Sequence, residues 1–417
     1  MTEKSPRLTC TRRGFLQAGA AFLAGMASSR HILAQNSGPT EGKLSTGRKV
    51  RLGVVGGGFG ASFQWHEHPD CIVQAVSDLR ADRRQVLMDS YRCPTAYNSL
   101  EELIKDKQVD AVAVFTGAPD HVRHVVACLR AGKHVICAVP AAFTLEECEE
   151  LVQAVAETGL TYMMAETSYY HPAVISARKW HAEGRFGRIF YCEAEYHHPG
   201  LEALFTDEKG NRTWRWAYPP MHYPTHCTAY LVGVTGERLR TVTCTGWGDD
   251  APCLKDNAYH NPFWNETAFF TTDRGNAFRV AVYWNAPVRG TERGEWYGTR
   301  MSLFDPHPNG MGAVIVRPAG TTEKDDAGFV RALPDFESYP LPRYWETDML
   351  PEPLRHDSGH EGSHTFLTHE FIDALVHGRR PAIDVYEAVA YTAPGIVAHQ
   401  SALQGGKQLD IRSFDRE

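Results

Sequence analysis

Short apolar runs alternate with amphipathic segments between residues 50 and 165 of the chain. The apolar runs predict five strands, at 50–55, 71–77, 110–115, 133–138 and 160–165. The segments between them with helical spacing include 101–107, 119–131 and 145–158. Thr144 and Glu147 form a capping box before the last of these helices. This alternation predicts an α/β domain, residues 49–168, with a doubly wound parallel sheet covered by helices on both faces.

The pattern changes after residue 170. One helix is predicted at 172–183, and strand-like runs separated by turn residues then dominate, at 188–196, 239–246, 266–272, 277–284 and 299–304. Pro, Asp and Gly are frequent at 318–362, which predicts a long irregular segment. Two helices, 363–377 and 386–404, close the chain. We therefore expect residues 169–417 to form a C-terminal α+β domain with an open, mainly antiparallel sheet.

The N-terminal segment has the features of an export signal. Thr11-Arg12-Arg13-Gly14-Phe15-Leu16 matches a twin-arginine signal, and the apolar run at 15–26 is too short to span a bilayer. Small residues lead to a cleavage site after Ala34, which predicts a signal peptide at 1–34 and a polar linker at 35–48. The expected partner is the twin-arginine translocation machinery, and the expected location is periplasmic or otherwise exported. An ordinary disordered N-terminus is the alternative.

Composition narrows the classes of partner. The net charge is −7, with both signs interspersed and no basic stripe, so no nucleic-acid partner is expected. No later run of about 18 apolar residues follows, so no stable membrane insertion is expected. Nine of the ten cysteines lie beyond Cys10 without CxxC spacing, and several fall in apolar runs. This predicts buried free thiols rather than a disulfide framework.

A glycine-rich turn follows the first predicted strand. It reads Gly56-x-Gly58-x-x-Ala61, and a helix is expected after it. Such a turn lets the backbone approach a pyrophosphate, and Asp78, 22 residues after Gly56, stands where a carboxylate binds the ribose of NAD. Arg80 could bind a 2′-phosphate, but Asp78 would repel one, so NAD is favoured over NADP. The cofactor contacts predicted for this Rossmann domain are Gly56, Gly58, Phe59, Gly60 and Asp78.

Further motifs connect the chain to a known family. Gly117-Ala118-Pro119-Asp120-His121 and Ala131-Gly132-Lys133-His134-Val135, with the glycine turn, resemble the Gfo/Idh/MocA family of sugar oxidoreductases from about Val50 onward. In that family a strand ends in Glu-Lys-Pro, and the lysine contacts cofactor and substrate; Ala138-Val139-Pro140 stands there in this chain. Further cofactor contacts expected with this resemblance are Pro119, His121, Val139, Pro140 and Glu166.

One branch of the family also lacks this lysine. The stretch at 137–142, Cys-Ala-Val-Pro-Ala-Ala, is similar to the Glu-Val-Pro-Ala-Ala stretch of the NAD-dependent α-N-acetylgalactosaminidases. The residues at 163–166, Met-Met-Ala-Glu, and at 223–226, Tyr-Pro-Thr-His, extend the similarity. Ala138 is a departure, because the branch has glutamate there. The resemblance places His226 at the family's catalytic histidine and His222 at its aspartate.

Oxidation of a sugar alcohol needs a base for the hydroxyl proton, and imidazole has a suitable pKa. His226 is the first candidate, and His222 could orient it or act as a second base. Tyr170, after the last strand of the first domain, is a candidate proton donor. The spacing of the two histidines would also suit a metal, but Pro224 lies between them and no carboxylate stands in a matching motif, so no metal is expected. Packing roles are the alternative for all three side chains.

Several residues could contact a sugar. His198 ends a predicted strand and is similar to a histidine of the glycosidases, while Trp214 and Arg215 offer a stacking face and a planar donor. Tyr223 is the fourth predicted substrate contact. For Trp214, packing in the core is the alternative. His360 and His364 flank the start of a C-terminal helix and are further candidates, with helix-capping and surface roles as the alternative.

An exported protein would find little free NAD outside the cytoplasm, which suggests a cofactor that is loaded before export and held tightly. The resemblance then implies redox-neutral cleavage of a glycoside by oxidation, elimination and reduction. The alternatives are an NAD-dependent sugar dehydrogenase with net hydride transfer and a non-catalytic sugar-binding protein. The substrate would be a small carbohydrate or glycoside. The family resemblance also implies a homo-oligomer that associates through the open sheet.

Overall fold

The computed structural model describes residues 47–287, 291–305 and 312–415. All of them belong to the unit Thr40–Glu417. The predicted export signal lies outside the described residues, as does most of the predicted linker.

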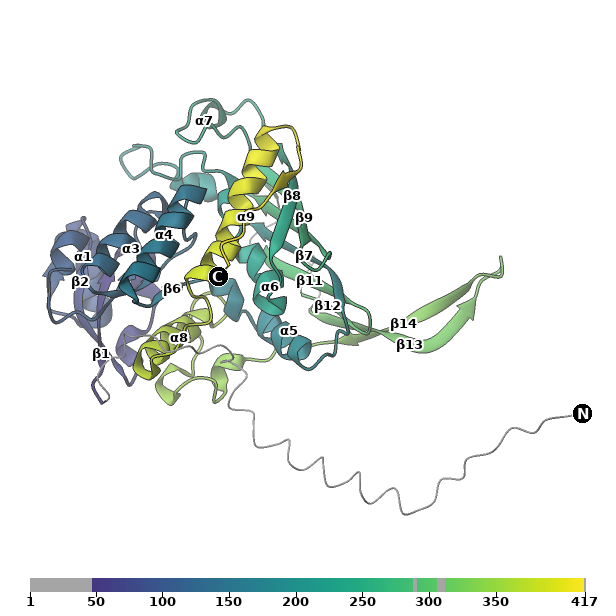
Figure 1. Ribbon diagram of the computed structural model, residues 1–417, viewed down its shortest axis with the longest axis horizontal. Helices are drawn as coiled ribbons and strands as arrows, with labels where there is room; N and C mark the ends of the chain where they lie inside the picture. The colour runs from purple at the N-terminus through teal and green to yellow at the C-terminus, as the bar shows by residue number, and fades with distance from the viewer. Residues whose placement is uncertain (1–46, 288–290, 306–311, 416–417) are drawn as a thin grey trace, which may run out of the picture. The chain divides into compact units, whose positions relative to one another are not determined.

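The N-terminal domain is built on a parallel six-stranded sheet in the order β3-β2-β1-β4-β5-β6. Its strands are β1 (Val50–Val55), β2 (Cys71–Ser77), β3 (Ala96–Tyr97), β4 (Ala111–Val114), β5 (His134–Cys137) and β6 (Tyr162–Met164). The helices that follow them are α1 (Ala81–Tyr91), α2 (Leu100–Leu103), α3 (His121–Arg130) and α4 (Leu145–Thr158). The strand order reverses between β1 and β4, as in dinucleotide-binding sheets, so the predicted doubly wound fold is confirmed (Figure 1).

Two hydrophobic layers cover the two faces of this sheet. One contains Val112 and Val114 of β4 with Val125 of α3 and Leu151 of α4. The other contains Leu52 and Val54 of β1 with Leu87 of α1 and residues of α8 (Ser363–His377), which returns from the end of the chain. The predicted capping box is present at the start of α4. The Thr144 side chain accepts a hydrogen bond from the Glu147 backbone amide, and the Glu147 side chain accepts one from the Thr144 backbone amide.

The C-terminal domain is built on a nine-stranded sheet in the order β14-β13-β12-β11-β7-β10-β9-β8-β15. Its strands are β7 (Ile189–His197), β8 (Leu239–Trp247), β9 (Asn265–Thr272), β10 (Ala277–Tyr283), β11 (Thr291–Gly298), β12 (Ser302–Phe304), β13 (Val314–Lys324), β14 (Val330–Ser338) and β15 (Leu409–Asp410). Only the β7–β10 pair is parallel, so the prediction of a mainly antiparallel sheet is confirmed.

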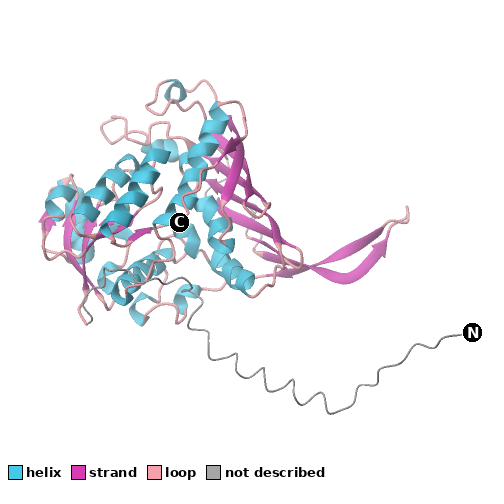
Figure 2. Ribbon diagram, viewed as in Figure 1, coloured by secondary structure: helices cyan, strands magenta, loops and turns pink. Residues whose placement is uncertain are grey.

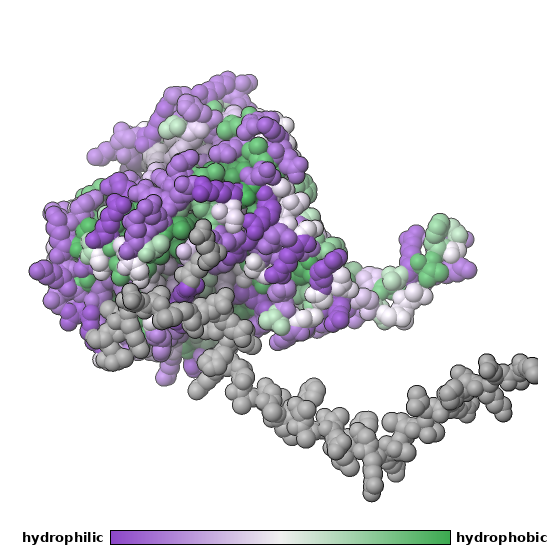
Figure 3. All heavy atoms as spheres, viewed as in Figure 1, coloured by the Kyte–Doolittle hydropathy of each residue, from purple (hydrophilic) through white to green (hydrophobic). Residues whose placement is uncertain are grey.

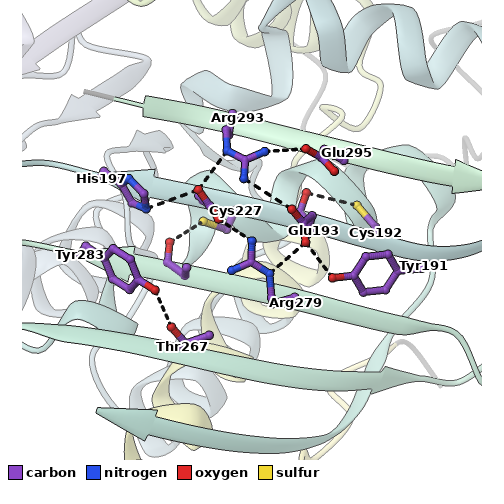
Figure 4. Close-up of polar contacts among 12 residues, drawn as sticks. Tyr191, Cys192, Glu193, His197, Cys227, Thr267, Arg279, Tyr283, Arg293 and Glu295 are labelled. Carbon is purple, nitrogen blue, oxygen red and sulfur yellow. Dashed lines mark hydrogen bonds and ion pairs between the residues drawn. The ribbon is translucent and has the colours of Figure 1, made fainter. Parts of the chain in front are cut away.

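Helices cover one face of this second sheet (Figure 2). They are α5 (Pro172–Ala182), α6 (Thr225–Thr235) and α9 (Val385–Leu403), and a short α7 (Pro252–Lys255) lies in the loop after β8. The opposite face carries a charged network, in which Arg279 and Arg293 pair with Glu193, Glu195 and Glu295 (Figure 4).

One prediction for the C-terminal domain is wrong. The segment 318–362, expected to be irregular, contains most of the β13–β14 hairpin. Only Val314–Val316 of β13 pairs with β12, and the rest forms a two-stranded ribbon whose side chains are mostly exposed, with Phe329 and Val330 at the end far from β12 (Figure 3). A ribbon with solvent on both faces has no apolar alternation for the sequence to show.

The described cysteines match their prediction. Nine of them, from Cys71 to Cys253, are buried and free. Within the described ranges, no helix combines the length and the apolar character needed to cross a bilayer. Over the same ranges, no three His, Cys, Asp or Glu side chains are arranged to hold a metal ion.

Candidate active site

A cavity of about 240 Å³, partly open to solvent, lies between the carboxyl ends of the parallel strands and the second sheet. Ligands bind at this edge in doubly wound folds. The first domain contributes Phe59, Phe115, Thr116, Ala118, His121, Ala138, Val139, Ala165 and Thr167. The second contributes Tyr196, His198, Leu201, Leu204, Trp214, Arg215, Tyr223, His226, Trp284 and His360. None of these lining residues is an aspartate or a glutamate.

The glycine turn is shaped for close backbone packing. Gly56 has φ +102°, and a Cβ there would lie 2.2 Å from the Phe115 carbonyl oxygen. Asp78 accepts a hydrogen bond from the Gly57 amide at 2.7 Å, which fixes the turn against the end of β2. A Cβ on Gly58 would meet nothing nearer than 3.9 Å, so this residue presents free backbone to the site. These features fit a dinucleotide.

The helix expected after this turn is absent. A 3-10 turn, Phe59–Ser62, follows instead, and Phe63 and Trp65 then bury their side chains in the core. So short a turn has little helix dipole to offer a phosphate, and the role assigned to a helix N-terminus is corrected. Arg80 pairs with Asp82 at 2.6 Å, which leaves its guanidinium engaged away from a 2′-phosphate.

The helix α6 begins directly after Pro224, and His226 lies in its first turn. Its Nδ1 lies 2.8 Å from Glu166 Oε1 and 3.1 Å from Ser168 Oγ. A carboxylate can only accept, so Nδ1 carries a proton and Nε2 is the ring nitrogen left for the cavity. The rings of Tyr196 and Tyr223 pack against the imidazole at 4.7 and 5.0 Å and hold its orientation.

A second carboxylate stands near the same nitrogen. Glu292 Oε2, on β11, lies 3.8 Å from His226 Nδ1 and 3.5 Å from His171 Nε2, and it accepts a hydrogen bond from the Ser168 hydroxyl. Burial acts to lower the pKa of His226, but Glu166 and Glu292 outweigh it and raise that pKa to about 9. Burial likewise opposes ionisation of Glu292, yet His226 and His171 bring its pKa below the ordinary value.

His360 and His364 form a hydrogen-bonded pair, of which His360 lines the cavity. His364 Nδ1 lies 2.9 Å from the Ser62 carbonyl oxygen, and His364 Nε2 lies 2.8 Å from His360 Nδ1. Burial lowers the pKa of His364 to about 4, and burial also lowers the pKa of His360. His364 is itself buried, whereas His360 is exposed where it lines the cavity.

The predicted substrate contacts come together, whereas two predicted catalytic residues lie elsewhere. His198, Trp214, Arg215 and Tyr223 all line the cavity, with the Arg215 guanidinium 4.2 Å from the centre of the Trp214 ring. Within the described ranges, no carboxylate lies at ion-pair distance from Arg215, so it is a cation open to a ligand.

His222 does not line the cavity. Its ring packs against Phe143 and His399 at 5.4 and 5.2 Å, and burial lowers its pKa to about 3. Tyr170 is buried and stacks on Phe366 at 5.3 Å, with no hydrogen-bond partner for its hydroxyl among the described residues. The geometry therefore gives neither residue the direct role predicted for it, because packing against other elements turns both away.

Sequence reasoning missed Ser168 and Glu292 as partners of His226. Glu292 belongs to β11, a strand rich in charged residues that the apolar pattern did not reveal. Glu166, predicted to face the cofactor, is fully buried behind His226 instead. The sequence marks Glu292 only by its place between Thr291 and Arg293. That place can be interpreted only after β11 is known to be a strand.

Comparisons with known proteins agree with this geometry. A family model described as "Oxidoreductase family, NAD-binding Rossmann fold" matches residues 50–166. The part of the chain that matches is thus an NAD-binding Rossmann domain similar to that of the Gfo/Idh/MocA oxidoreductases. A "Glycosyl hydrolase family 109 protein" of Streptomyces coelicolor is 25% identical over 404 residues, which cover 88% of this chain and 83% of that protein.

Two other proteins resemble parts of the chain or its fold. A trans-1,2-dihydrobenzene-1,2-diol dehydrogenase of Macaca fuscata fuscata is 32% identical over 35% of this chain and 44% of its own length. The structure of a levoglucosan dehydrogenase in complex with NADH superposes with a TM-score of 0.69 at 17% identity, covering 88% of this chain and all of that one. The structural likeness shows the fold, and the family-model match indicates an NAD-dependent enzyme.

The predicted NAD contacts fall into two groups. Phe59, His121 and Val139 line the cavity, and the Pro140 carbonyl lies 2.8 Å from His121 Nδ1. The others are not among the residues that line the cavity: Gly56, Gly58, Gly60, Asp78 and Pro119. Val139 places a methyl-lined wall where the family's lysine would stand, so no amine acts there.

Proposed function

We propose that this protein is an exported glycoside-cleaving enzyme that uses a tightly bound NAD in a redox-neutral reaction. The similarity to a family 109 glycosyl hydrolase over most of the chain carries the proposal. The cavity supports it in one respect. Val139 removes from the site the amine that would serve a plain alcohol dehydrogenase of this family, and the imidazoles of His226, His198 and His360 line the same space.

Each part of the site has a proposed task. The glycine turn and Asp78 would hold the dinucleotide, with Val139 and His121 beside its reactive end. Bound NAD would accept a hydride from a carbon of the sugar ring and return it after the glycosidic bond has broken. Arg215 and Trp214 would hold the sugar by hydrogen bonds and stacking. The histidines would move protons to and from the substrate.

Cleavage by elimination follows from the chemistry of a ring ketone. A ketone acidifies the neighbouring C–H bond, so a side chain with pKa near neutrality can remove that proton. The electron pair forms a C=C bond as the glycosidic oxygen leaves, and a proton donor neutralises the oxygen. Addition of water and reduction of the ketone restore a free sugar. Contacts with the cavity wall would hold the intermediate between these steps.

The test uses purified protein with no added cofactor. Aryl glycosides of several sugars are supplied, nucleotide released by denaturation is identified, and absorbance of NADH is followed during turnover. The proposal predicts bound NAD, many turnovers per enzyme and no net NADH. Strict dependence on added NAD with one NADH formed per turnover would contradict it. His226→Gln, which should abolish cleavage while retaining NAD, is the control against a contaminating hydrolase.

A sugar dehydrogenase with net hydride transfer is the second candidate. The 32% identity to a diol dehydrogenase over 147 residues, 35% of this chain, favours it. It predicts NADH accumulation and a ketosugar product in the same assay, so the two candidates are separated by one experiment.

The export and assembly of the protein also belong to the proposal. The twin-arginine motif at 11–16 would deliver the folded, NAD-loaded protein to the periplasm, and Arg12→Lys with Arg13→Lys should retain it in the cytoplasm. The face of the second sheet that helices leave open would form the contact between copies of the chain. Light scattering of the purified protein should then give a mass that is a multiple of the mass of its polypeptide measured in the same sample, whereas a monomer would contradict this part.

A further inference from the structure

The carboxylates behind His226 have few counter-charges. Glu166 is fully buried, and among the described residues its only ion-pair partner is His226, at 2.8 Å. Glu292 pairs only with His226 and His171 over the same ranges, and no arginine or lysine reaches either carboxylate. Buried carboxylates without a cation are costly. The positive charge must therefore come from within the cluster, and His226, which contacts both, is the group placed to supply it.

The hydrogen bonds of His360 and His364 fix a neutral state for His360, in contrast to His226. The Ser62 carbonyl can only accept, so His364 Nδ1 carries the proton of that bond. With His364 neutral, its Nε2 is a lone pair and accepts from His360 Nδ1. A neutral His360 then has its remaining lone pair on Nε2. That nitrogen belongs to a residue that lines the cavity and stays accessible there.

The loop that carries His360 has an unusual backbone. His360 and Glu361 have φ of +52° and +55°, and Gly362 has +83°. Left-handed conformations cost free energy for residues with a Cβ, and two in a row persist only where the surroundings enforce them. Gly359 is also required, because a Cβ there would lie 2.4 Å from the His364 ring. The loop is thus constrained to present His360 to His364.

We propose that the cavity divides proton transfer between two histidines, with His226 Nε2–H as the donor and His360 Nε2 as the acceptor. This assignment deepens the proposed function and rests on it for the identity of the reaction. In the elimination step, His360 takes the proton from the acidified carbon, the freed electron pair forms the C=C bond, and the C–O bond breaks. The departing oxygen takes the proton of His226. Glu166, Glu292 and His364 are positioning residues, since they act through these two imidazoles.

Other charged or titratable groups surround the pair. Those that face His226 or His360 from neighbouring elements are Glu166, His171, Tyr196, His198, Arg215, Tyr223, Glu292 and His364. Burial lowers the pKa of His198, and Arg215 and His226 lower it further, so a second neutral imidazole stands nearby. Arg215 does not titrate. The two carboxylates are therefore the groups that set the charge of His226.

The test reads protonation directly and does not need a substrate. The protein is labelled with ¹⁵N-histidine, the signals of the two residues are assigned with His226→Gln and His360→Gln, and both are followed from pH 5.5 to 9.5. At pH 7 the proposal predicts that both nitrogens of His226 are protonated and that only Nδ1 of His360 is. A His226 signal with one protonated nitrogen, or a His360 protonated on Nε2 alone, would overturn it.

Two pairs of variants test the positioning residues. Glu292→Gln removes one charge and should move the His226 titration to lower pH, whereas Glu295→Gln, on the same strand but paired with Arg293 on the other face, should not. His364→Phe should release the His360 tautomer, and His364→Gln, which can still donate to Ser62 and accept from His360, should restore it. An unmoved His226 titration in Glu292→Gln would overturn the role of Glu292.

Activity then separates this inference from the proposed function. If glycosides are cleaved, the rate at pH 8.5 should fall about tenfold in Glu292→Gln and much less at pH 6, because the donor is lost only as His226 deprotonates. An equal loss at both pH values would contradict the donor role. If no glycoside is cleaved, the proposed function fails, while the nuclear magnetic resonance experiment still decides the charges of the two histidines.

Discussion

The pair formed by Glu166 and His226 predicts a specific dependence of stability on pH. A histidine whose pKa rises from 6.5 to about 9 on folding stabilises the folded state by about 3 kcal/mol. Because the folded-state value is the higher one, this contribution is fully present below pH 6.5 and is lost as the pH rises through 9. His226 is only 5% exposed, so solvent screening removes little of it. Glu166, the nearer carboxylate, should account for the larger part.

The perturbation is Glu166→Gln, which keeps the shape and the acceptor for the Ser168 amide but removes the charge. The free energy of unfolding is measured by urea denaturation of both proteins from pH 6 to pH 9.5, with NAD at the same saturating concentration. The difference between them should be largest at pH 6 and should shrink by about 2–3 kcal/mol by pH 9.5.

A control on the second sheet removes general charge effects. Glu295→Gln breaks an ion pair with Arg293, which does not titrate in this range, so its effect should be nearly constant with pH. A Glu166→Gln effect that is equally constant would refute the reasoning, because it would mean that folding does not change the protonation of His226.

Three further predictions concern ligand binding. Gly58→Ala should leave the fold intact but weaken NAD binding at least about tenfold in calorimetry, since the added Cβ enters the space of the ligand. Gly56→Ala should instead lower the melting temperature, because its Cβ would meet Phe115. Asp78→Ala should weaken NAD by a similar factor and make the turn more susceptible to proteolysis; unchanged affinity would remove Asp78 from the site. Arg215→Ala should raise KM for the sugar about tenfold or more with little change in NAD affinity, and an equal loss of both would show a structural role.

The sequence predicted most of what buried strands and capped helices determine. The first domain and its parallel sheet follow from apolar runs that must be covered on both faces, and α4 and α8 have the predicted bounds. The β13–β14 ribbon and β11 were missed, since strands with charged or exposed side chains carry no such pattern.

Site residues that belong to sequence motifs could be predicted. Contacts between residues far apart in the sequence could not. His226, Arg215 and Tyr223 were found from motifs and line one cavity. The partnership of His226 with Glu292 joins residues 66 positions apart, from α6 and β11. The link from Ser62 to His364 spans 302 positions. Neither contact has a local signature, because both depend on the packing of α6 and α8 against other elements.

The same packing explains two errors. His222 lies only four residues from His226, but the 3-10 turn before Pro224 directs it to His399 on α9. The hydroxyl of Tyr170 is likewise removed from the cavity by stacking on Phe366 of α8. Spacing along the chain therefore predicted the composition of the site better than its geometry.

The most direct test of redox-neutral cleavage is the fate of hydrogen on the sugar carbon beside the oxidised one. Purified enzyme, without added NAD, cleaves an active aryl glycoside in deuterium oxide, and the released sugar is examined by nuclear magnetic resonance. The account predicts deuterium at that carbon in every product molecule. It predicts no deuterium in substrate molecules that the enzyme has not oxidised. A cleaved sugar that retains all its original hydrogen would show direct hydrolysis and would contradict the account.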